Sequence, residues 1–406
     1  MKILNISRIG NRIKDLAVIG VNADGCLILC GSGEEMTCFR SGSIVHRLLF
    51  FEYDSDNDCL NENIFKDLYV LKILSSTFCY DALTDNGIGF FIEAADGESI
   101  NIVKCDFNSH NFERLFSISN VYGNSISDSP IQLILLTQRY FAIKIFNKKT
   151  CIIYVWDTEK KERYDVLFSE NDDMRYAHLD YLSIDDIPYL LVQKRGKSNW
   201  KMEFYLHQWE KTTEFNKYKD EKLFLFPLQK LISEGKIVLH ENYIIAQVDE
   251  KQELLYHSYA KKCIVYSYMH FNKHNKEGFF QEELFFYDTY KKQITDHFTL
   301  DGLLLVSKKG CVYEYSNDKN YMIVKNLRGN KTYNLPYQNA GLLNVIDEAL
   351  ILNIKSEIII FDLKNLREVG RYYSEDKKLN VPSQVRALAI ELKHKYFEKE
   401  NLLVMY

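Results

Sequence analysis

One pattern recurs four times along the chain. A mostly apolar run ends in an aspartate, and six or seven residues later another apolar run begins. The clearest copy is CIIYVWDTEKKERYDVLF, residues 151–168, and the four marker aspartates are Asp106, Asp157, Asp288 and Asp362. The spacing is typical of a strand, a short polar turn and a second strand, because an aspartate side chain can accept hydrogen bonds from backbone amides two residues on. The pattern therefore predicts β-hairpins along the whole chain.

The gaps between the markers leave room for further, degenerate copies. Grouping the apolar runs in fours gives about seven units within residues 1–380. The predicted units are residues 13–57, 68–118, 129–170, 175–226, 236–300, 301–337 and 339–375. In the fourth unit, with predicted strands in KMEFYLHQW and TTEFNKY, Glu210 takes the place of the marker aspartate.

The tripeptide Val155-Trp156-Asp157 ends the third run of the third unit, as in a WD repeat. The chain resembles the β-propeller superfamily and is WD-repeat-like, although this motif is complete only once and no Gly-His dipeptide begins a unit. The resemblance implies an all-β fold, a ring of about seven four-stranded antiparallel blades around a central channel. Seven units in 406 residues average about 58 residues, against roughly 40–45 for a compact WD-repeat blade, so the excess is expected in loops.

Short strands with turn signals also fit two β-sandwiches or a string of smaller β domains. Two features favour the propeller. The repeats run almost from end to end, and no linker rich in proline, glycine or serine divides the chain.

Composition bounds the function. Hydrophobic residues at 46% and charged residues at 26% are typical of a soluble globular protein, and the net charge of −5 argues against DNA or an anionic membrane as the main ligand. No secretory signal or membrane-spanning run is recognised. Of the nine cysteines, Cys79, Cys105, Cys151 and Cys263 lie in apolar runs, which favours reduced thiols and a cytoplasmic location.

Two helices and a terminal pairing are predicted. FPLQKLISEG, residues 226–235, has a proline early and a glycine at its end. In residues 381–406, Pro382-Ser383 precedes apolar residues at helical spacing, Val385, Leu388, Ala389, Leu392 and Tyr396, which predicts an amphipathic helix. KILNIS at residues 2–7 and NLLVMY at residues 401–406 are the candidates for strands that join the two ends of the chain.

The sequence contains no complete local motif for catalysis or metal binding. There is no phosphate-binding loop, nucleophile elbow or HExxH. DSDNDCLNENIF imitates the start of a calcium loop at Asp54, Asp56 and Asp58, but it lacks the turn glycine and the final glutamate. The cysteine cluster Cys26, Cys30 and Cys38 is interpreted as core packing rather than a metal site. The histidine pair His270 and His274 is interpreted as part of a loop. No metal or cofactor is therefore predicted.

Two basic loops are the best candidate for a binding surface. In a propeller the connections between second and third strands emerge on one face, and here those of the fourth and fifth units are KRGKSNWK and NKHNKEGF. We expect both loops and the helix at 226–235 to lie together. The predicted partner-binding residues are Arg195, Lys197, Trp200, Lys273, His274, Lys276 and Phe279. An aromatic side chain among basic groups suits an acidic segment of another protein.

The leading hypothesis is a non-enzymatic scaffold or adaptor that binds another protein on these loops. The alternative is a hydrolase or lyase with its site at the channel mouth, where residues scattered in sequence leave no local motif. A third reading is binding of single-stranded nucleic acid, which uses similar groups but suits the acidic chain less well. Solvated, lysine-rich loops without a partner are the plain structural reading.

Overall fold

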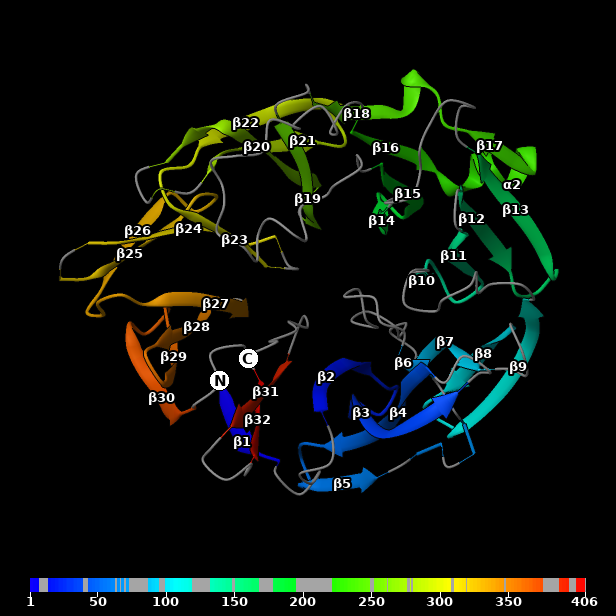
Figure 1. Cartoon of the computed structure of the whole chain (residues 1–406), viewed down its shortest axis with the longest axis horizontal. Helices are drawn as coiled ribbons and strands as arrows, with labels where there is room; N and C mark the ends of the chain where they lie inside the picture. The colour runs from blue at the N-terminus through cyan, green and yellow to red at the C-terminus, as the bar shows by residue number, and fades with distance from the viewer. Residues whose placement is uncertain are drawn as a thin grey trace. The chain divides into compact units, whose positions relative to one another are not determined.

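The computed structural model describes most of the chain in two compact units, Met1–Ser125 with Leu303–Tyr406, and Ile126–Gly302 (Figure 1). The described residues are 1–6, 14–38, 43–62, 64–65, 67–68, 71–72, 87–94, 99–118, 132–147, 150–167, 178–194, 221–248, 252–260, 262–275, 278, 280–307, 310–318, 320–346, 348–374, 387–393 and 399–405.

Within its described residues, the first unit contains five sheets of antiparallel strands. The β2–β6 sheet contains β2 (Lys14–Val21), β3 (Leu27–Cys38), β4 (Ser43–Asp54), β5 (Cys59–Glu62) and β6 (Leu71–Lys72), which pairs with β4. The β7–β9 sheet contains β7 (Ile88–Ala94), β8 (Ile100–Asp106) and β9 (Asn111–Ile118). The β23–β26 sheet contains β23 (Leu303–Val306), β24 (Val312–Asn317), β25 (Met322–Asn326) and β26 (Lys331–Leu335). The β27–β30 sheet contains β27 (Gly341–Ile346), β28 (Ala349–Ile354), β29 (Glu357–Asp362) and β30 (Arg367–Tyr373).

The fifth sheet joins the two ends of the chain. β1 (Lys2–Asn5) pairs antiparallel with β32 (Lys399–Met405), which pairs with β31 (Ala387–Lys393). Figure 1 shows β1 in blue beside β32 in red. We call this the terminal sheet, and it confirms the two strands predicted to join the chain ends.

The second unit contains three sheets among its described residues. The β10–β13 sheet contains β10 (Gln132–Leu135), β11 (Tyr140–Asn147), β12 (Thr150–Asp157) and β13 (Glu162–Leu167). The β14–β18 sheet contains β14 (His178–Ile184), β15 (Ile187–Lys194), β16 (Lys222–Pro227) and β18 (Ile244–Gln247), with the 3-10 helix η4 (Glu241–Tyr243) before β18. The β19–β22 sheet contains β19 (Gln252–Ala260), β20 (Cys263–His274), β21 (Phe280–Asp288) and β22 (Gln293–Thr299).

Neighbouring sheets in each unit pack through shared apolar cores, because alternate side chains of a strand point to opposite faces. In the second unit, Val155 of β12 and Val192 of β15 belong to one core, while Leu191 of β15 and Ile264 of β20 belong to the next. In the first unit, Leu352 and Ile360 of the β27–β30 sheet enter two different cores in the same way. Sheets that pack face to face in series are blades, and the predicted β-propeller of about seven four-stranded units is confirmed.

The marker aspartates begin turns of one geometry. In each turn the aspartate Oδ1 accepts hydrogen bonds from the backbone amides two and three residues later, as expected. Turns of this kind begin at Asp54, Asp106, Asp157, Asp288 and Asp362. In a sixth, Asn326 accepts from Gly329. The residue four positions after each marker is left-handed: Asp58, His110, Lys161, Lys292, Asn330 and Leu366.

The turn at Asp54 explains the calcium-like sequence. Asp54 Oδ1 accepts from the amides of Asp56 and Asn57 at 2.9 and 3.1 Å. Asp58 Oδ1 accepts from the hydroxyl of Tyr53 at 2.9 Å. The carboxylates of Asp54 and Asp58 are therefore used to hold a hairpin turn.

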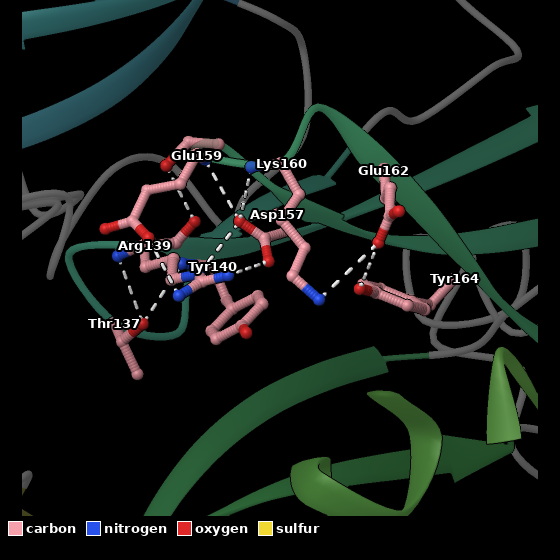
Figure 2. A network of polar contacts seen from close by, with 9 residues as sticks. Thr137, Arg139, Tyr140, Asp157, Glu159, Lys160, Glu162 and Tyr164 are labelled. Atoms are coloured by element: carbon pink, nitrogen blue, oxygen red, sulfur yellow. Dashed lines mark hydrogen bonds and ion pairs between the residues drawn. The ribbon is translucent and has the colours of Figure 1, made fainter. Parts of the chain in front are cut away.

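The turn at Asp157 is the most elaborate (Figure 2). The Asp157 carboxylate is fully buried, and both its oxygens accept from Arg139, at 2.9 Å from Nε and 2.5 Å from the terminal nitrogen. Burial raises the pKa of Asp157, but the Arg139 guanidinium and the amides of Lys160 and Glu159 outweigh it and hold that pKa at about 2. The tripeptide Val155-Trp156-Asp157 thus has a structural role, because its aspartate is an anion at the centre of a turn network.

The predicted helix at 226–235 is present as α2 (Leu228–Glu234), which ends at Gly235 with a φ of 73°. Leu228 and Leu231 are fully buried against the core shared by the β10–β13 and β14–β18 sheets. After α2, β17 (Lys236–Val238) pairs in parallel with the outer strand β13. A connection inside the β14–β18 sheet therefore covers the edge of the sheet before it.

Two sequence predictions are wrong. The amphipathic helix predicted over residues 382–396 is a strand, β31, wherever the structure describes it. Ile390 and Leu392 are fully buried at alternate positions, so a period of two prevails over the helical spacing. The fourth unit also extends beyond its predicted end at residue 226, because β18 pairs with β16. No helix in the described part of the chain is long and apolar enough to cross a membrane.

Candidate functional site beside two basic segments

Two of the predicted binding residues lie in the described structure. Lys273 and His274 are exposed at the end of β20. The other five lie outside the described residues: Arg195, Lys197, Trp200, Lys276 and Phe279. The strands that enter and leave their loops are described, so the base of each loop can be located.

The loop of the β14–β18 sheet is longer than the sequence predicted. β15 ends at Lys194, and its partner in β16 is Lys222, so residues 195–221 connect the second strand to the third. The sequence predicted the third strand at KMEFYLHQW, which lies outside the described residues, as does Glu210. The pairing shows that β16 is the third strand. The basic segment is therefore part of a long connection.

The loop of the β19–β22 sheet is short, because β20 continues to His274. His274 pairs with Phe280 across the hairpin, and their ring centroids lie 5.3 Å apart. The Asn275 side-chain amide donates to the carbonyl of Gly302 at 3.1 Å, and the Gly278 amide donates to the Asn275 carbonyl at 3.1 Å. Lys273 and His274 thus lie at the end of β20, where the register of its pairing with β21 shifts between His270 and His274.

The ends of the long connection are held against β19 of the neighbouring sheet. The Gln193 side-chain amide donates to the Leu254 carbonyl at 2.5 Å, and the Leu254 amide donates to Glu221 Oε2 at 2.7 Å. Gln193 and Glu221 are each only 1% exposed and flank the long connection. Buried hydrogen bonds of this kind are costly to break, especially with a charged acceptor. Leu254 pairs with Tyr268 of β20, the strand that continues to His274, so these bonds join the two sheets that carry the basic segments.

Histidines gather at this end of the β19–β22 sheet. His270 Nε2 lies 3.2 Å from Glu283 Oε2, and His297 Nε2 lies 3.8 Å from the same oxygen. The Gln252 side-chain nitrogen lies 3.3 Å from His270 Nδ1, and the His297 ring stacks on Phe285 with centroids 4.5 Å apart. Glu283 can pair electrostatically with either ring when that ring is protonated.

The predicted place of the helix is wrong. α2 follows Pro227, which pairs with Tyr189 near the start of β15, whereas the long loop follows Lys194 at the other end of that strand. A connection between third and fourth strands emerges opposite one between second and third strands. α2 therefore lies at the end of the sheet away from the two basic loops.

A serine, a histidine and a glutamate meet on three strands of the β19–β22 sheet. His257 Nε2 lies 2.7 Å from Ser267 Oγ, and that hydroxyl donates to Glu282 Oε1 in a short hydrogen bond. A nucleophilic relay needs the acid on the other imidazole nitrogen, but Glu282 Oε1 lies 3.4 Å from the same Nε2. Ser267 is also fully buried. The cluster is therefore a polar core contact without the connectivity of a hydrolase triad.

Sequence reasoning missed these contacts, since their residues are dispersed over strands and carry no local motif. Within the described residues, no group of three histidine, cysteine, aspartate or glutamate side chains is placed to hold a metal ion.

The chain was also compared with known proteins. No protein-family model and no curated protein matches the sequence. Among solved structures, the chain is similar to the Dos1 propeller, with 10% identity, coverage of 99% of this chain and 94% of that chain, and a TM-score of 0.49. It is also similar to an oligogalacturonate lyase in complex with manganese, with 9% identity, coverage of 100% and 97%, and a TM-score of 0.48. Sqt1 of Saccharomyces cerevisiae is similar at 8% identity, with coverage of 96% of each chain and a TM-score of 0.44.

Proposed function

We propose that this protein is a non-enzymatic adaptor that binds an acidic segment of a partner protein on the two basic loops of the β14–β18 and β19–β22 sheets. The observation that supports this most directly is the pair of hydrogen bonds that join Gln193 and Glu221 to Leu254. These bonds tie both ends of the long connection to the sheet that carries Lys273 and His274. The binding residues are those predicted from the sequence: Arg195, Lys197, Trp200, Lys273, His274, Lys276 and Phe279.

Charge also supports this proposal. The segment RGKSNWK begins directly after Lys194, and Lys273 and His274 are exposed on β20. Lysine and arginine beside tryptophan and phenylalanine form a suitable surface for carboxylates and an apolar anchor.

Purified components test the proposal best. A partner is first recovered from a lysate with the wild-type protein, and its binding is then measured by isothermal titration. The double variant Trp200→Ala, Phe279→Ala is expected to weaken binding at least tenfold, and raised salt is expected to weaken the wild-type complex. Tyr373→Ala, which changes a half-exposed aromatic residue on β30, is the control. Equal affinity of the double variant and the wild type would contradict the proposal.

We also propose a cytoplasmic location for this adaptor. Cys105 is a fully buried thiol, and burial raises its pKa, which keeps this thiol protonated and unreactive. A buried reduced cysteine suits a reducing compartment. Cell fractionation with an antibody to the protein tests this, and recovery in a secreted fraction would exclude it.

A further inference from the structure

The repeated turns make an internal comparison possible. In the five turns that begin with an aspartate, the residue two positions later donates its backbone amide to that aspartate, so the turn requires no particular side chain at this position. In five of the six described turns this residue is polar: Asp56, Asn108, Glu159, Arg328 and Lys364. In the β19–β22 sheet it is Tyr290, which is 72% exposed. The turn therefore has no structural need for an aromatic side chain at this position.

Three lysines lie near Tyr290, one across the sheet and two directly after it in sequence. Lys262 Nζ lies 5.6 Å from the centroid of the Tyr290 ring, within cation–π distance, and also pairs with Asp185 at 3.2 Å. Lys291 and Lys292 follow Tyr290 directly and are exposed. Within the described part of the chain, neither ammonium group lies in an ion pair, so both can meet an incoming carboxylate.

Two carboxylates near Tyr290 already have partners. Asp288 accepts from the amides of Tyr290 and Lys291, at 2.9 and 2.8 Å, and these bonds hold its pKa below the usual value. Asp185 pairs with Lys262.

An apolar residue extends this surface. Ile294 of β22 is 49% exposed and pairs with Tyr287 of β21, which packs against the core shared by the β14–β18 and β19–β22 sheets. Exposed tyrosine and isoleucine side chains beside lysines offer apolar contact together with positive charge.

We propose that Tyr290, Ile294, Lys262, Lys291 and Lys292 form a second docking surface, for a short acidic peptide segment that carries an aromatic residue. We call it the Tyr290 surface. It lies at the end of β21 marked by Asp288, whereas His274 and the basic loop lie at the Phe280 end of the same strand. A partner on this surface and a partner on the two loops can therefore bind together.

The choice of a peptide over nucleic acid follows from Ile294. Single-stranded nucleic acid is held by stacked bases and a track of cations along its backbone. Here a single exposed aromatic ring lies on the same hairpin as an exposed aliphatic side chain, which suits the side chains of a peptide better than a row of stacked bases.

The test uses the full chain and two fluorescein-labelled peptides, Asp-Asp-Phe-Asp-Asp and Ser-Ser-Phe-Ser-Ser, in fluorescence anisotropy at about 0.15 M salt. The acidic peptide is expected to bind at least fivefold more tightly than the serine peptide. Tyr290→Ala is expected to weaken binding of the acidic peptide at least fivefold, Tyr290→Phe to preserve it, and Lys292→Glu to weaken it at least threefold.

Matched variants keep the test decisive. Lys364→Ala changes the equivalent turn position of the β27–β30 sheet and is expected to leave binding unchanged, as is Trp200→Ala in the basic loop. Circular dichroism melting confirms that Tyr290→Ala is folded. No detectable binding of the acidic peptide, equal binding by Tyr290→Ala, or tighter binding of a labelled oligothymidine than of the peptide would overturn the proposal.

Discussion

At the scale of single residues, the fold depends on side chains that serve the backbone. Asp157 is the clearest case, because its buried carboxylate accepts from Arg139 and from two backbone amides. Asp157 is also the last residue of the WD-like tripeptide Val155-Trp156-Asp157. What looks in the sequence like a functional signature is thus an anion that orders a turn.

Asp157→Asn is expected to lower the free energy of unfolding at pH 7. The folded pKa of about 2 lies below the unfolded value of about 3.9, so the ionised form contributes stability above pH 4 that is lost as the pH falls toward 2. The shift corresponds to about 2 kcal/mol. Urea unfolding at pH 7 and pH 2.5 checks this, with the exposed Asp186→Asn as control. A difference of the same size at both pH values would contradict it.

Leu366→Asn is expected to stabilise the protein by about 1 kcal/mol. Left-handed backbone is sterically unfavourable for leucine, and asparagine adopts it at a lower cost in free energy. Leu366 has a φ of 50° and is 63% exposed, so little packing is lost. Asn330 occupies the same turn position in the β23–β26 sheet, and Asn330→Leu should destabilise to a similar degree. Thermal unfolding of both variants measures the effect, and two shifts of the same sign would refute it.

At the scale of elements, the most distinctive piece is α2 with β17, which covers the outer edge of β13. Exposed strand edges invite pairing with other chains, and here the chain's own connection pairs with three residues of that edge. The sequence predicted α2 from its proline and glycine. It could not predict β17, because a three-residue parallel pairing between two sheets leaves no periodic pattern.

Ile237→Ala is expected to reduce the free energy of unfolding by about 2–4 kcal/mol, since Ile237 is 2% exposed in the core that α2 also enters. Faster hydrogen exchange is expected at the Leu239 amide, which donates to the Leu167 carbonyl at 2.9 Å. The neighbouring exposed Lys236→Ala serves as the control and should change stability by less than about 0.5 kcal/mol. Equal effects of the two variants would contradict the assigned role of β17.

The error at β31 shows how two periodicities compete in one segment. Leu388 and Leu392 are four residues apart and fit a helix, but Leu388, Ile390 and Leu392 fit a strand equally well. Pairing with β32 decides between them, and that pairing is not visible in a local window. The link between the ends of the long connection and β19 was beyond prediction for a related reason. The contacts of Leu254 with Gln193 and Glu221 depend on how two sheets are aligned, while the sequence showed only that both loops are basic.

At the scale of the whole molecule, the sequence yielded the fold class and most strands, because the repeated aspartate turns and alternating apolar residues are local signals. The sequence also suggested one long-range feature, the pairing of the two chain ends in the terminal sheet. Leu402, Leu403 and Val404 of β32 are almost fully buried, each worth about 1.5–3 kcal/mol. Their sum is comparable with the whole stability of a typical domain.

Removal of residues 399–406 is therefore expected to abolish cooperative unfolding or to lower the Tm by more than about 10 °C. Differential scanning calorimetry checks this. Lys2→Ala, which removes only an exposed contact with the carbonyl of Ser55, should leave the Tm nearly unchanged. A truncated chain with the melting behaviour of the intact protein would show that the terminal sheet is dispensable.

The terminal sheet also sets the response of the protein to a pulling force. Because β1 and β32 are antiparallel, Lys2 pairs with Met405 and both chain ends leave from the same end of the pair. A force applied to the two termini then opens one residue pair at a time, from Lys2 and Met405 toward Asn5 and Leu402. Pairs loaded in series in this way resist far less than strands sheared along their length, so mechanical unfolding is expected to start where the chain begins and ends.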